Sequence, residues 1–344
     1  MLAASGTTNA FVYTHDLYAS LVWRWERAYE MAFTSGAGGS VGTPGGWYTE
    51  GSNVTVTATP AEGLAFSSWT GNVPEAQRYQ ATLSFAASQP VTATANFATV
   101  YYVRTDGSDA ASGLSWAEAK QTLEAAVAAA GSAGTILVSN GVHSINAIWL
   151  QVSQPLTIRG VNGPDVTALK AANVNYTADK YRRVMLVNHP GAFISGFTMS
   201  NGWHDTGIST DGDGPGALRL LSGTVSNCVV RNNMGAGLSG GVQVGGGLLT
   251  HCALFRNTAY RAYGIVGYGG GVTVAGGTVR SCVITNNTAQ NNGSGLYQTG
   301  GLVQDCLIAD NAQMYGDTGS GGGGYVSGGV LERCVISGNL RAWS

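Results

Sequence analysis

The stretch LTHCALFRN at residues 249–257 is one of five related stretches that share the pattern aliphatic-x-x-Cys-x-aliphatic-x-x-Asn. The other four are VSNCVVRNN at 225–233, VRSCVITNN at 279–287, VQDCLIADN at 303–311 and LERCVISGN at 331–339. Their cysteines, which are all five of the chain, follow one another at intervals of 24, 30, 24 and 28 residues. A repeat of this size indicates a solenoid.

The apolar residues inside each stretch indicate strands, because they fall at an odd-even spacing that cannot line one face of a helix. Pairs or triplets of glycine precede a second strand, as at 240–244 and 269–274. The aliphatic start of the next stretch supplies a third. The sequence therefore predicts rungs of three short strands, stacked into a parallel β-helix.

Equivalent residues of stacked rungs lie about 4.8 Å apart, directly above one another. We therefore expect two ladders inside the coil. One consists of Cys228, Cys252, Cys282, Cys306 and Cys334, and the other of Asn233, Asn257, Asn287, Asn311 and Asn339. Thiols fill a narrow interior. The side-chain amides of asparagines can hydrogen-bond along the coil axis, and asparagine tolerates a left-handed backbone conformation at a corner.

The cysteines could alternatively form disulfides or bind a metal ion. No Cys-x-x-Cys pair exists and the chain has only five histidines, so the ligand spacing of zinc sites is absent. Parallel Cβ atoms about 4.8 Å apart are also too distant for an ordinary disulfide. The pattern favours buried free thiols over bridges.

The composition limits the classes of partner. Charged residues make up 10% of the chain, against about 25% in ordinary soluble domains, and the net charge is −2. Because no basic block is present, we expect neither nucleic acid nor an anionic membrane as a partner. We also expect no membrane span, since no apolar run approaches the required 18 or so residues.

No signal peptide follows Met1, and the chain stops part-way through a rung, so we expect a monomeric fragment of a longer protein.

Residues 29–98 carry the phrases GSNVTVTATP at 51–60, FSSWTG at 66–71 and VTATANF at 91–97. Through these phrases the segment resembles the divergent internalin-type B-repeat, a small β domain that serves as a spacer in bacterial surface proteins. Residues 1–28 are then the tail of a preceding module or a linker. Trp69 could be a ligand platform, but a core position is favoured because a small β domain needs a large apolar anchor.

Residues 101–143 begin with YYVRTDGSD and continue to SW at 115–116. Ser115 and Glu118 predict a capping box at the start of a helix that ends at Gly131. This segment resembles the entrance of bacterial right-handed parallel β-helix proteins of the pectate-lyase-like class, in which one helix caps the first rung. The resemblance implies an all-β fold, with rungs over 144–344, where Phe197 takes the cysteine position and Gly202 the asparagine position.

Enzymes of that class use clustered acidic residues for calcium, together with an arginine or lysine base, and glycosidases on the same coil use aspartates. The catalytic candidates are Asp205, Asp211 and Asp213, and the pair Asp211 and Asp213 could share a calcium ion. A polar turn is the favoured interpretation of this segment. No other cofactor is expected.

Other polar and aromatic residues have structural interpretations. Asp106 and Asp109 fit an Asx-type turn, and Arg182 and Arg183 fit a solvated loop. His251, next to Cys252, is expected to point outward. The tyrosines of the late rungs could stack on sugar rings, but packing between rungs is favoured. They are Tyr260, Tyr263, Tyr268, Tyr297 and Tyr325.

We interpret the chain as a non-enzymatic bacterial cell-surface or secreted repeat protein, a stiff scaffold for adhesion or for binding carbohydrate or protein. The expected partner is a polysaccharide or a protein on a host or neighbouring surface, and the expected location is extracellular. The alternative is a polysaccharide lyase or glycoside hydrolase of the parallel β-helix class.

Overall fold

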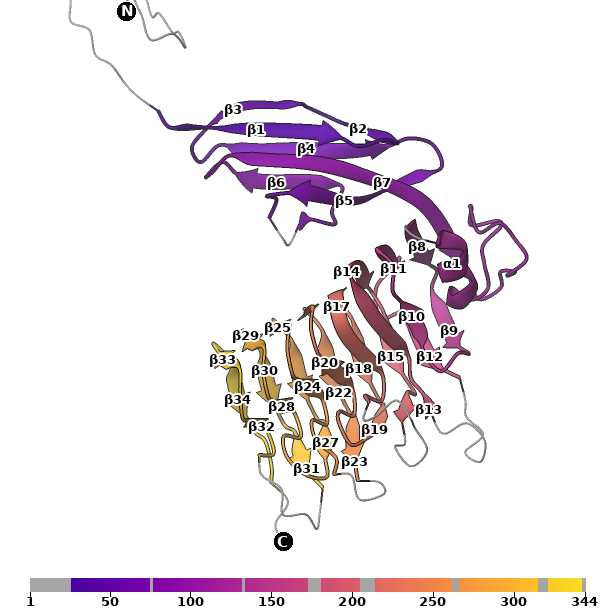
Figure 1. Cartoon of the computed structure of the whole chain (residues 1–344), viewed down its shortest axis with the longest axis vertical. Helices are drawn as coiled ribbons and strands as arrows, with labels where there is room; N and C mark the ends of the chain where they lie inside the picture. The colour runs from indigo at the N-terminus through magenta and orange to yellow at the C-terminus, as the bar shows by residue number, and fades with distance from the viewer. Residues whose placement is uncertain are drawn as a thin grey trace, which may run out of the picture.

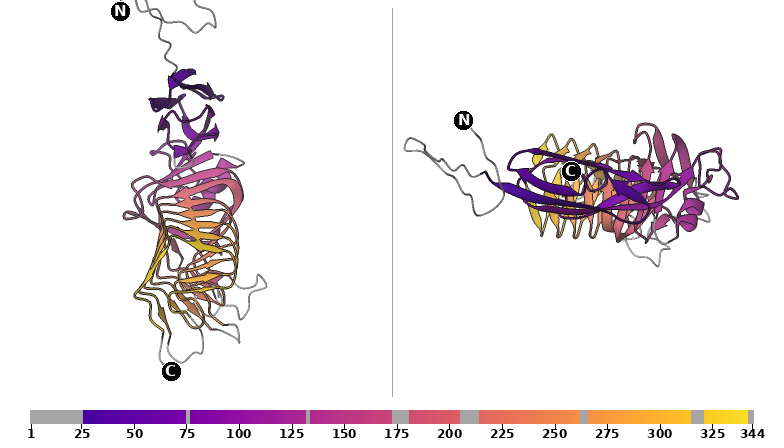
Figure 2. Two further views of the ribbon diagram at one scale, coloured as in Figure 1. Left: turned by 90° about the vertical axis from the view of Figure 1, so that its left-hand side faces the viewer. Right: turned by 90° about the horizontal axis from the view of Figure 1, so that it is seen from above.

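The computed structural model describes residues 26–74, 77–131, 134–172, 181–204, 214–261, 266–314 and 321–341. An N-terminal domain of seven strands precedes a coil of short parallel strands, and it lies along the length of the coil (Figures 1 and 2). The seven strands are β1 (Ala28–Ser35), β2 (Gly39–Val41), β3 (Gly45–Thr49), β4 (Asn53–Pro60), β5 (Leu64–Gly71), β6 (Thr82–Ala86) and β7 (Val91–Val103). No helix in these described ranges has the length and hydrophobicity needed to cross a bilayer.

The N-terminal domain packs around Trp69. Strands β3, β1, β7 and β5 pair side by side, and β2, β4 and β6 form a second, antiparallel sheet. The alternation of Val54, Val56 and Ala58 places all three side chains in the core. Trp69 is fully buried and its Nε1 donates a hydrogen bond to the Gln80 carbonyl at 2.9 Å, so the predicted core position is confirmed.

Strand β7 connects the two parts without a linker. Its first half pairs with β1 and β5, and its last residues, Val100–Val103, pair in parallel with β8 (Gly134–Val138), the first strand of the coil. A stacked contact between Tyr79 and Phe193, with ring centroids 4.0 Å apart, adds a second connection. The N-terminal domain is therefore fixed to the coil at two points.

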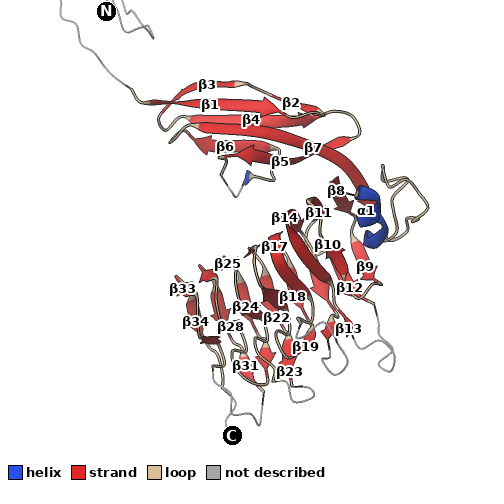
Figure 3. Cartoon of the chain, viewed as in Figure 1, coloured by secondary structure: helices blue, strands red, loops and turns tan. Residues whose placement is uncertain are grey.

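Helix α1 (Leu123–Ala130) is the only α-helix of the described residues, and it lies where β7 enters the coil (Figure 3). Its N-cap is Thr122, whose Oγ1 accepts a hydrogen bond from Ala125 N. The predicted start at Ser115 was wrong. The Ser115–Glu118 hydrogen bond exists, at 3.2 Å, but it closes a turn, because Asp109 binds the backbone of residues 121 and 122 and delays the helix.

The early rungs of the coil are irregular. Their strands are β9 (Gly141–Ile145), β10 (Leu150–Val152), β11 (Leu156–Gly160), β12 (Thr167–Ala171), β13 (Tyr181–Arg182), β14 (Met185–Ser195), β15 (Thr198–Ser200), β16 (Trp203–His204), β17 (Leu218–Ser226), β18 (Val229–Arg231) and β19 (Met234–Ala236). Phe197 aligns with Cys228, and Gly202 N donates to the Asn233 side chain at 2.8 Å. Both positions agree with the predicted register.

The later rungs repeat a unit of four strands. They comprise β20 (Val242–Val244), β21 (Leu248–Thr250), β22 (Ala253–Phe255), β23 (Thr258–Tyr260), β24 (Val272–Val274), β25 (Thr278–Arg280), β26 (Val283–Thr285), β27 (Thr288–Ala289), β28 (Leu296–Gln298), β29 (Leu302–Gln304), β30 (Leu307–Ala309), β31 (Ala312–Gln313), β32 (Gly324–Val326), β33 (Val330–Glu332) and β34 (Val335–Ser337). The prediction of three strands missed the one after each ladder asparagine, such as β23, which is short and carries no aliphatic alternation.

These strands build three walls. The first wall contains β20 and β21 and their equivalents, bent at residues 245–247; the second wall is the sheet of β9, β12, β15, β18, β22, β26, β30 and β34. The third wall contains β13, β16, β19, β23, β27 and β31. Aliphatic side chains from the first two walls, such as Val242, Val244 and Leu254, fill the core between them.

The asparagine ladder runs through the corner between the second and third walls. Successive side-chain amides donate to one another from Asn233 to Asn339, at 2.9 to 3.0 Å. The left-handed backbone, however, belongs to the preceding residue, as at Arg256 (φ 54°) and Asp310 (φ 54°). The ladder residue itself points inward because its neighbour makes the turn.

The cysteine ladder runs through the corner between the first and second walls. All five thiols are free, and the first four are at most 2% exposed. Each sulfur donates to the carbonyl two residues earlier, at 3.1 to 3.3 Å. The predicted buried thiols are confirmed, except that Cys334 is partly exposed. His251 is exposed, as predicted.

Replacing a ladder asparagine should destabilise the coil. Asn287 Oδ1 accepts hydrogen bonds from both Asn257 N and Asn257 Nδ2, so Asn287→Ala leaves two buried donors without an acceptor. We expect a loss of about 2–4 kcal/mol in the free energy of unfolding, measured by urea denaturation. The control Ser337→Ala, at an exposed site, should change it by less than about 0.5 kcal/mol. Equal stability of the two variants would contradict the ladder's role.

Thiol reactivity should follow burial. In the native protein, iodoacetamide should modify Cys334 first, because the other four sulfurs are enclosed by the coil. Peptide mass spectrometry after timed labelling measures the order, with a sample unfolded in guanidinium as the control in which all five react. Early labelling of Cys282 in folded protein would be inconsistent with the structure.

Candidate functional site

The predicted catalytic and calcium candidates Asp205, Asp211 and Asp213 lie outside the described residues, and their roles stay predictions. The described residues on either side of this segment are His204, at the end of β16, and Gly214. They lie near the start of β14, where Arg183 precedes the strand. The surroundings of Arg183 and His204 are therefore the described part of this candidate site.

Arg183 is buried, with 1% of its surface exposed, so the expectation of a solvated loop was wrong. Its guanidinium carbon lies 4.4 Å from the centroid of the Trp149 ring, in a cation–π contact. A Cβ at Gly214 would come within 2.8 Å of the same carbon, so the glycine backbone packs directly on the guanidinium. The aromatic face and the close backbone explain how a charged group occupies this interior position.

His204 is fully buried in the same corner. Burial, with the nearby charge of Arg183, lowers the pKa of His204 to about 3. The imidazole is therefore neutral at physiological pH, and the positive charge of this corner comes from arginine.

The acidic residues of the opening loop make structural contacts, but the predicted Asx-type turn was wrong, because Asp109 binds backbone 12 and 13 residues further along the chain. Asp109 accepts hydrogen bonds from Gln121 N at 2.9 Å, Thr122 N at 2.8 Å and Thr122 Oγ1 at 2.8 Å. Asp106 pairs with Arg104 at 2.7 Å. Among the residues with described positions, no group of three or more histidines, cysteines, aspartates and glutamates could hold a metal ion.

A row of polar and aromatic residues, which the sequence analysis missed, runs along the outer face of the first wall. We call it the outer row: Arg219, Gln243, Thr273, Tyr297 and Tyr325 occupy equivalent positions of β17, β20, β24, β28 and β32. Their neighbours on either side, such as Val242 and Val244, point into the core. Strict alternation inside each glycine-led strand was the signal that could have located this row.

Three successive residues of the outer row carry polar atoms that have no hydrogen-bond partner within the described part of the chain. These atoms are Arg219 Nε, Gln243 Oε1 and Thr273 Oγ1, and each is itself buried. Buried polar atoms are normally paired, since each unpaired one costs about 1–3 kcal/mol. Thr273 is itself buried, whereas the side chains of Arg219 and Gln243 are partly exposed on the outer face.

Tyr297 and Tyr325, at the end of the outer row, stack on each other, and Tyr268, which is not in the row, stacks on Tyr297. The ring centroids of Tyr268 and Tyr297 are 4.8 Å apart, and those of Tyr297 and Tyr325 are 5.3 Å apart with an interplanar angle of 8°. Burial, and then the neighbouring phenols, raise the pKa of Tyr297. Because the rings cover each other's faces, packing between rungs is the interpretation that the structure supports for these three.

A groove of about 530 Å³ crosses the first wall beside its bend. It is lined by hydroxyl, aliphatic and backbone groups together with Arg280 and Gln304. A second cavity, of about 400 Å³, lies between Tyr79 of the N-terminal domain and Pro155 of the coil, and Pro190 and Thr224 line both. The two cavities therefore share part of their walls.

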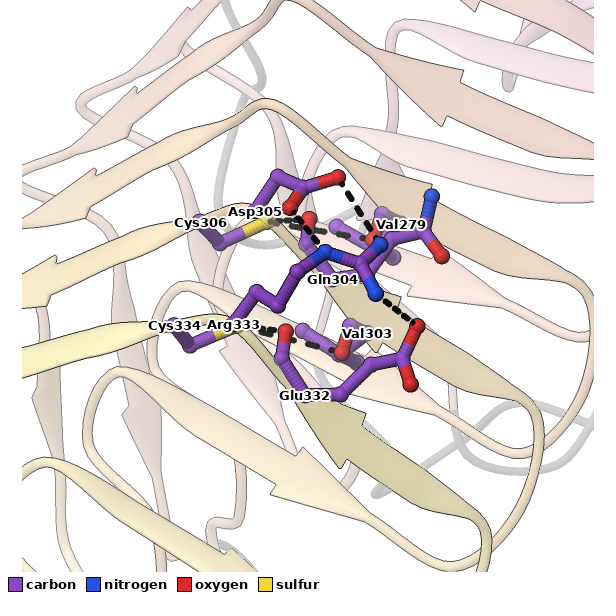
Figure 4. A network of polar contacts seen from close by, with 8 residues as sticks. All are labelled: Val279, Val303, Gln304, Asp305, Cys306, Glu332, Arg333 and Cys334. Atoms are coloured by element: carbon purple, nitrogen blue, oxygen red, sulfur yellow. Dashed lines mark hydrogen bonds and ion pairs between the residues drawn. The ribbon is translucent and has the colours of Figure 1, made fainter.

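An exposed ion-pair network lies at the C-terminal end of the first wall (Figure 4). Arg333 donates to Asp305 at 2.7 and 3.2 Å and to Glu332 at 2.7 Å. The hydrogen bond from Arg333 lowers the pKa of Asp305. Since all three groups are exposed to solvent, the network contributes little to stability.

One segment of the chain matches a known family, and the chain aligns with two solved structures. The family model of the divergent InlB B-repeat domain matches residues 29–101. Among solved structures, a rhamnogalacturonan lyase aligns at 11% identity and a TM-score of 0.40, over 69% of this chain and 62% of that protein. The pectin methylesterase from Aspergillus niger aligns at 14% identity and a TM-score of 0.32, over 70% of this chain and 85% of that protein. No curated protein matches the chain. Residues 29–101 are therefore a divergent InlB B-repeat domain, which is followed by a parallel β-solenoid.

Proposed function

We propose that this chain is a non-enzymatic bacterial cell-surface or secreted repeat protein that acts as a stiff scaffold and binds polysaccharide along the first wall of its coil. The location is extracellular, where the partner is a glycan of a host or neighbouring surface. The observation that carries the proposal is the first wall's open groove, lined by Arg280 and Gln304, together with the partly exposed Arg219 and Gln243 of the outer row.

The geometry of the outer row suits a chain of sugar rings. A polymer laid along the coil axis meets a new rung about every 4.8 Å, and each rung offers it a different hydrogen-bonding group. Gln243 provides an amide and Arg219 a cation that attracts sugar carboxylates, and Thr278 of the neighbouring groove provides a hydroxyl. Hydroxyl groups of a glycan can both donate and accept, so they match this mixed row.

The rigidity of the molecule supports the scaffold part of the proposal. The asparagine ladder connects five successive rungs through side-chain hydrogen bonds, and β7 continues from the B-repeat domain into the coil. A B-repeat domain joined in this way to such a coil holds the first wall at a fixed distance and angle from the N-terminal end of the domain.

Substitutions in the outer row should weaken glycan binding without loss of stability. Arg219→Gln removes the positive charge of a partly exposed side chain, so the free energy of unfolding should change by less than about 0.5 kcal/mol. Gln243→Ala removes the neighbouring amide. Each should weaken binding of a polysaccharide, identified in a panel of acidic and neutral polymers, by about three- to tenfold in isothermal titration calorimetry.

The control is Thr285→Val on the second wall, which should leave binding unchanged because its side chain lies on a different face. Unchanged affinity in both outer-row variants, or no binding to any polymer of the panel, would contradict the proposal.

A polysaccharide lyase or glycoside hydrolase remains the second candidate. It is favoured by one feature, the buried Arg183 and neutral His204 that precede the aspartates of the loop. This candidate predicts release of reducing ends or unsaturated products from a polysaccharide. If such cleavage occurs and is abolished by Asp211→Ala and Asp213→Ala, with binding retained, the non-enzymatic proposal is wrong.

A further inference from the structure

The outer face of the second wall carries an apolar row from β18 to β34. Its members are Val229, Ala253, Val283, Leu307 and Val335, which stand in register on successive strands. The last three are 42%, 36% and 60% exposed. Apolar side chains aligned on a flat sheet form the kind of face that sheets bury against another sheet.

A second row lies two residues further along each strand. It consists of Arg231, Phe255, Thr285, Ala309 and Ser337. The corner beyond it holds Arg256 and Asp310, both exposed and both with left-handed backbone at a φ of 54°. Within the described residues, neither of these two charges forms an ion pair.

The free part of this face begins at β18. On the preceding strand, β15, Thr198 is only 6% exposed, because its Oγ1 donates to the Pro164 carbonyl at 2.7 Å and that segment covers it. The five strands from β18 to β34 are therefore the part of the wall on which another flat surface can lie.

We propose that this face binds the same face of a second copy of the chain, with the two coils antiparallel and the two-fold axis parallel to the strands at β26. Each apolar row then lies on its own counterpart with the order of rungs reversed. Ala253 meets Leu307 of the second copy, Phe255 meets Ala309, and Val283 meets its own equivalent. Small side chains thus face large ones, which allows the two surfaces to interdigitate.

The charges agree with the same arrangement. Reversing the rungs about β26 brings Arg256 of one copy opposite Asp310 of the other, so that two ion pairs form symmetrically. A parallel arrangement of the two coils would instead place the second row on the first. Arg231 would then face Val229, and its guanidinium would be desolvated without a partner. The antiparallel arrangement is the one that pairs the unpaired charges.

The association is expected to be weak. Five strands span about 19 Å along the axis and about 17 Å across, or roughly 300–400 Å² on each copy, against about 800 Å² in a standard stable interface. Reversible dimers should therefore appear only at high concentration, as on a crowded surface. The interface lies on a different wall from the outer row, so it is independent of glycan binding.

Sedimentation velocity over roughly 10 μM to 1 mM tests the proposal. The weight-average sedimentation coefficient should rise with concentration in the wild-type chain. Val283→Glu puts two carboxylates against each other at the two-fold axis and should abolish that rise. The matched control Val142→Glu, at a 59% exposed valine of the same wall on β9, outside the free part of the face, should retain it. Thermal unfolding followed by circular dichroism confirms that both variants are folded.

A charge exchange tests the antiparallel geometry. Arg256→Asp or Asp310→Arg alone should weaken association by about three- to tenfold, and the double variant should restore it to within about twofold. Both substitutions are compatible with the backbone of the corner, because arginine and aspartate already occupy equivalent positions there at a φ of 54°. A monomer at every concentration overturns the proposal, as does a dimer that is insensitive to Val283→Glu or is not restored by the exchange.

Discussion

Hydrogen bonding along the coil axis is the interaction on which the rest of this structure depends. Each rung is too short to bury its apolar face alone, so it is stable only when stacked on its neighbours. The asparagine ladder enforces that stacking. In Asn257, for example, Oδ1 accepts from the backbone and side chain of Asn233, while Nδ2 donates to Val230 O and to Asn287. Every hydrogen-bonding position of this buried side chain is used, so the corner has one register.

The third wall shows what this stacking requires of the backbone. Strand β23 lies so close to the returning chain that a Cβ at Gly240 would come within 2.4 Å of the Thr258 carbonyl carbon. In the next rung a Cβ at Gly270 would come within 2.2 Å of Thr288 O. Only glycine fits at these approaches. The abundance of glycine in this chain, 52 residues, is therefore partly a packing requirement of narrow rungs.

The walls then differ in what they offer to partners. The first wall combines a groove with the outer row, in which Arg219 and Gln243 are partly exposed. The second wall presents aliphatic side chains such as Val283 and Leu307. Because the ladders fix the register of all rungs, these rows are straight and regular. A regular row can engage a polymer on one wall and a second coil on another.

The repeat by itself determined the coil, its two ladders and the outward direction of His251, because alternation and equal offsets translate directly into stacked positions. The core position of Trp69 followed from the need of a small β domain for a large apolar anchor. It did not determine the start of α1, since the Asp109 carboxylate, which binds the backbone of residues 121 and 122, acts across a loop. It also did not reveal that Arg183 is buried on Trp149 or that Arg219, Gln243 and Thr273 form one row. Those side chains come together only when irregular early rungs and glycine-led strands are stacked, and the spacing between such residues varies along the chain. The tertiary structure therefore decided which polar groups share a face, because a contact between rungs depends on loop lengths that no local pattern encodes.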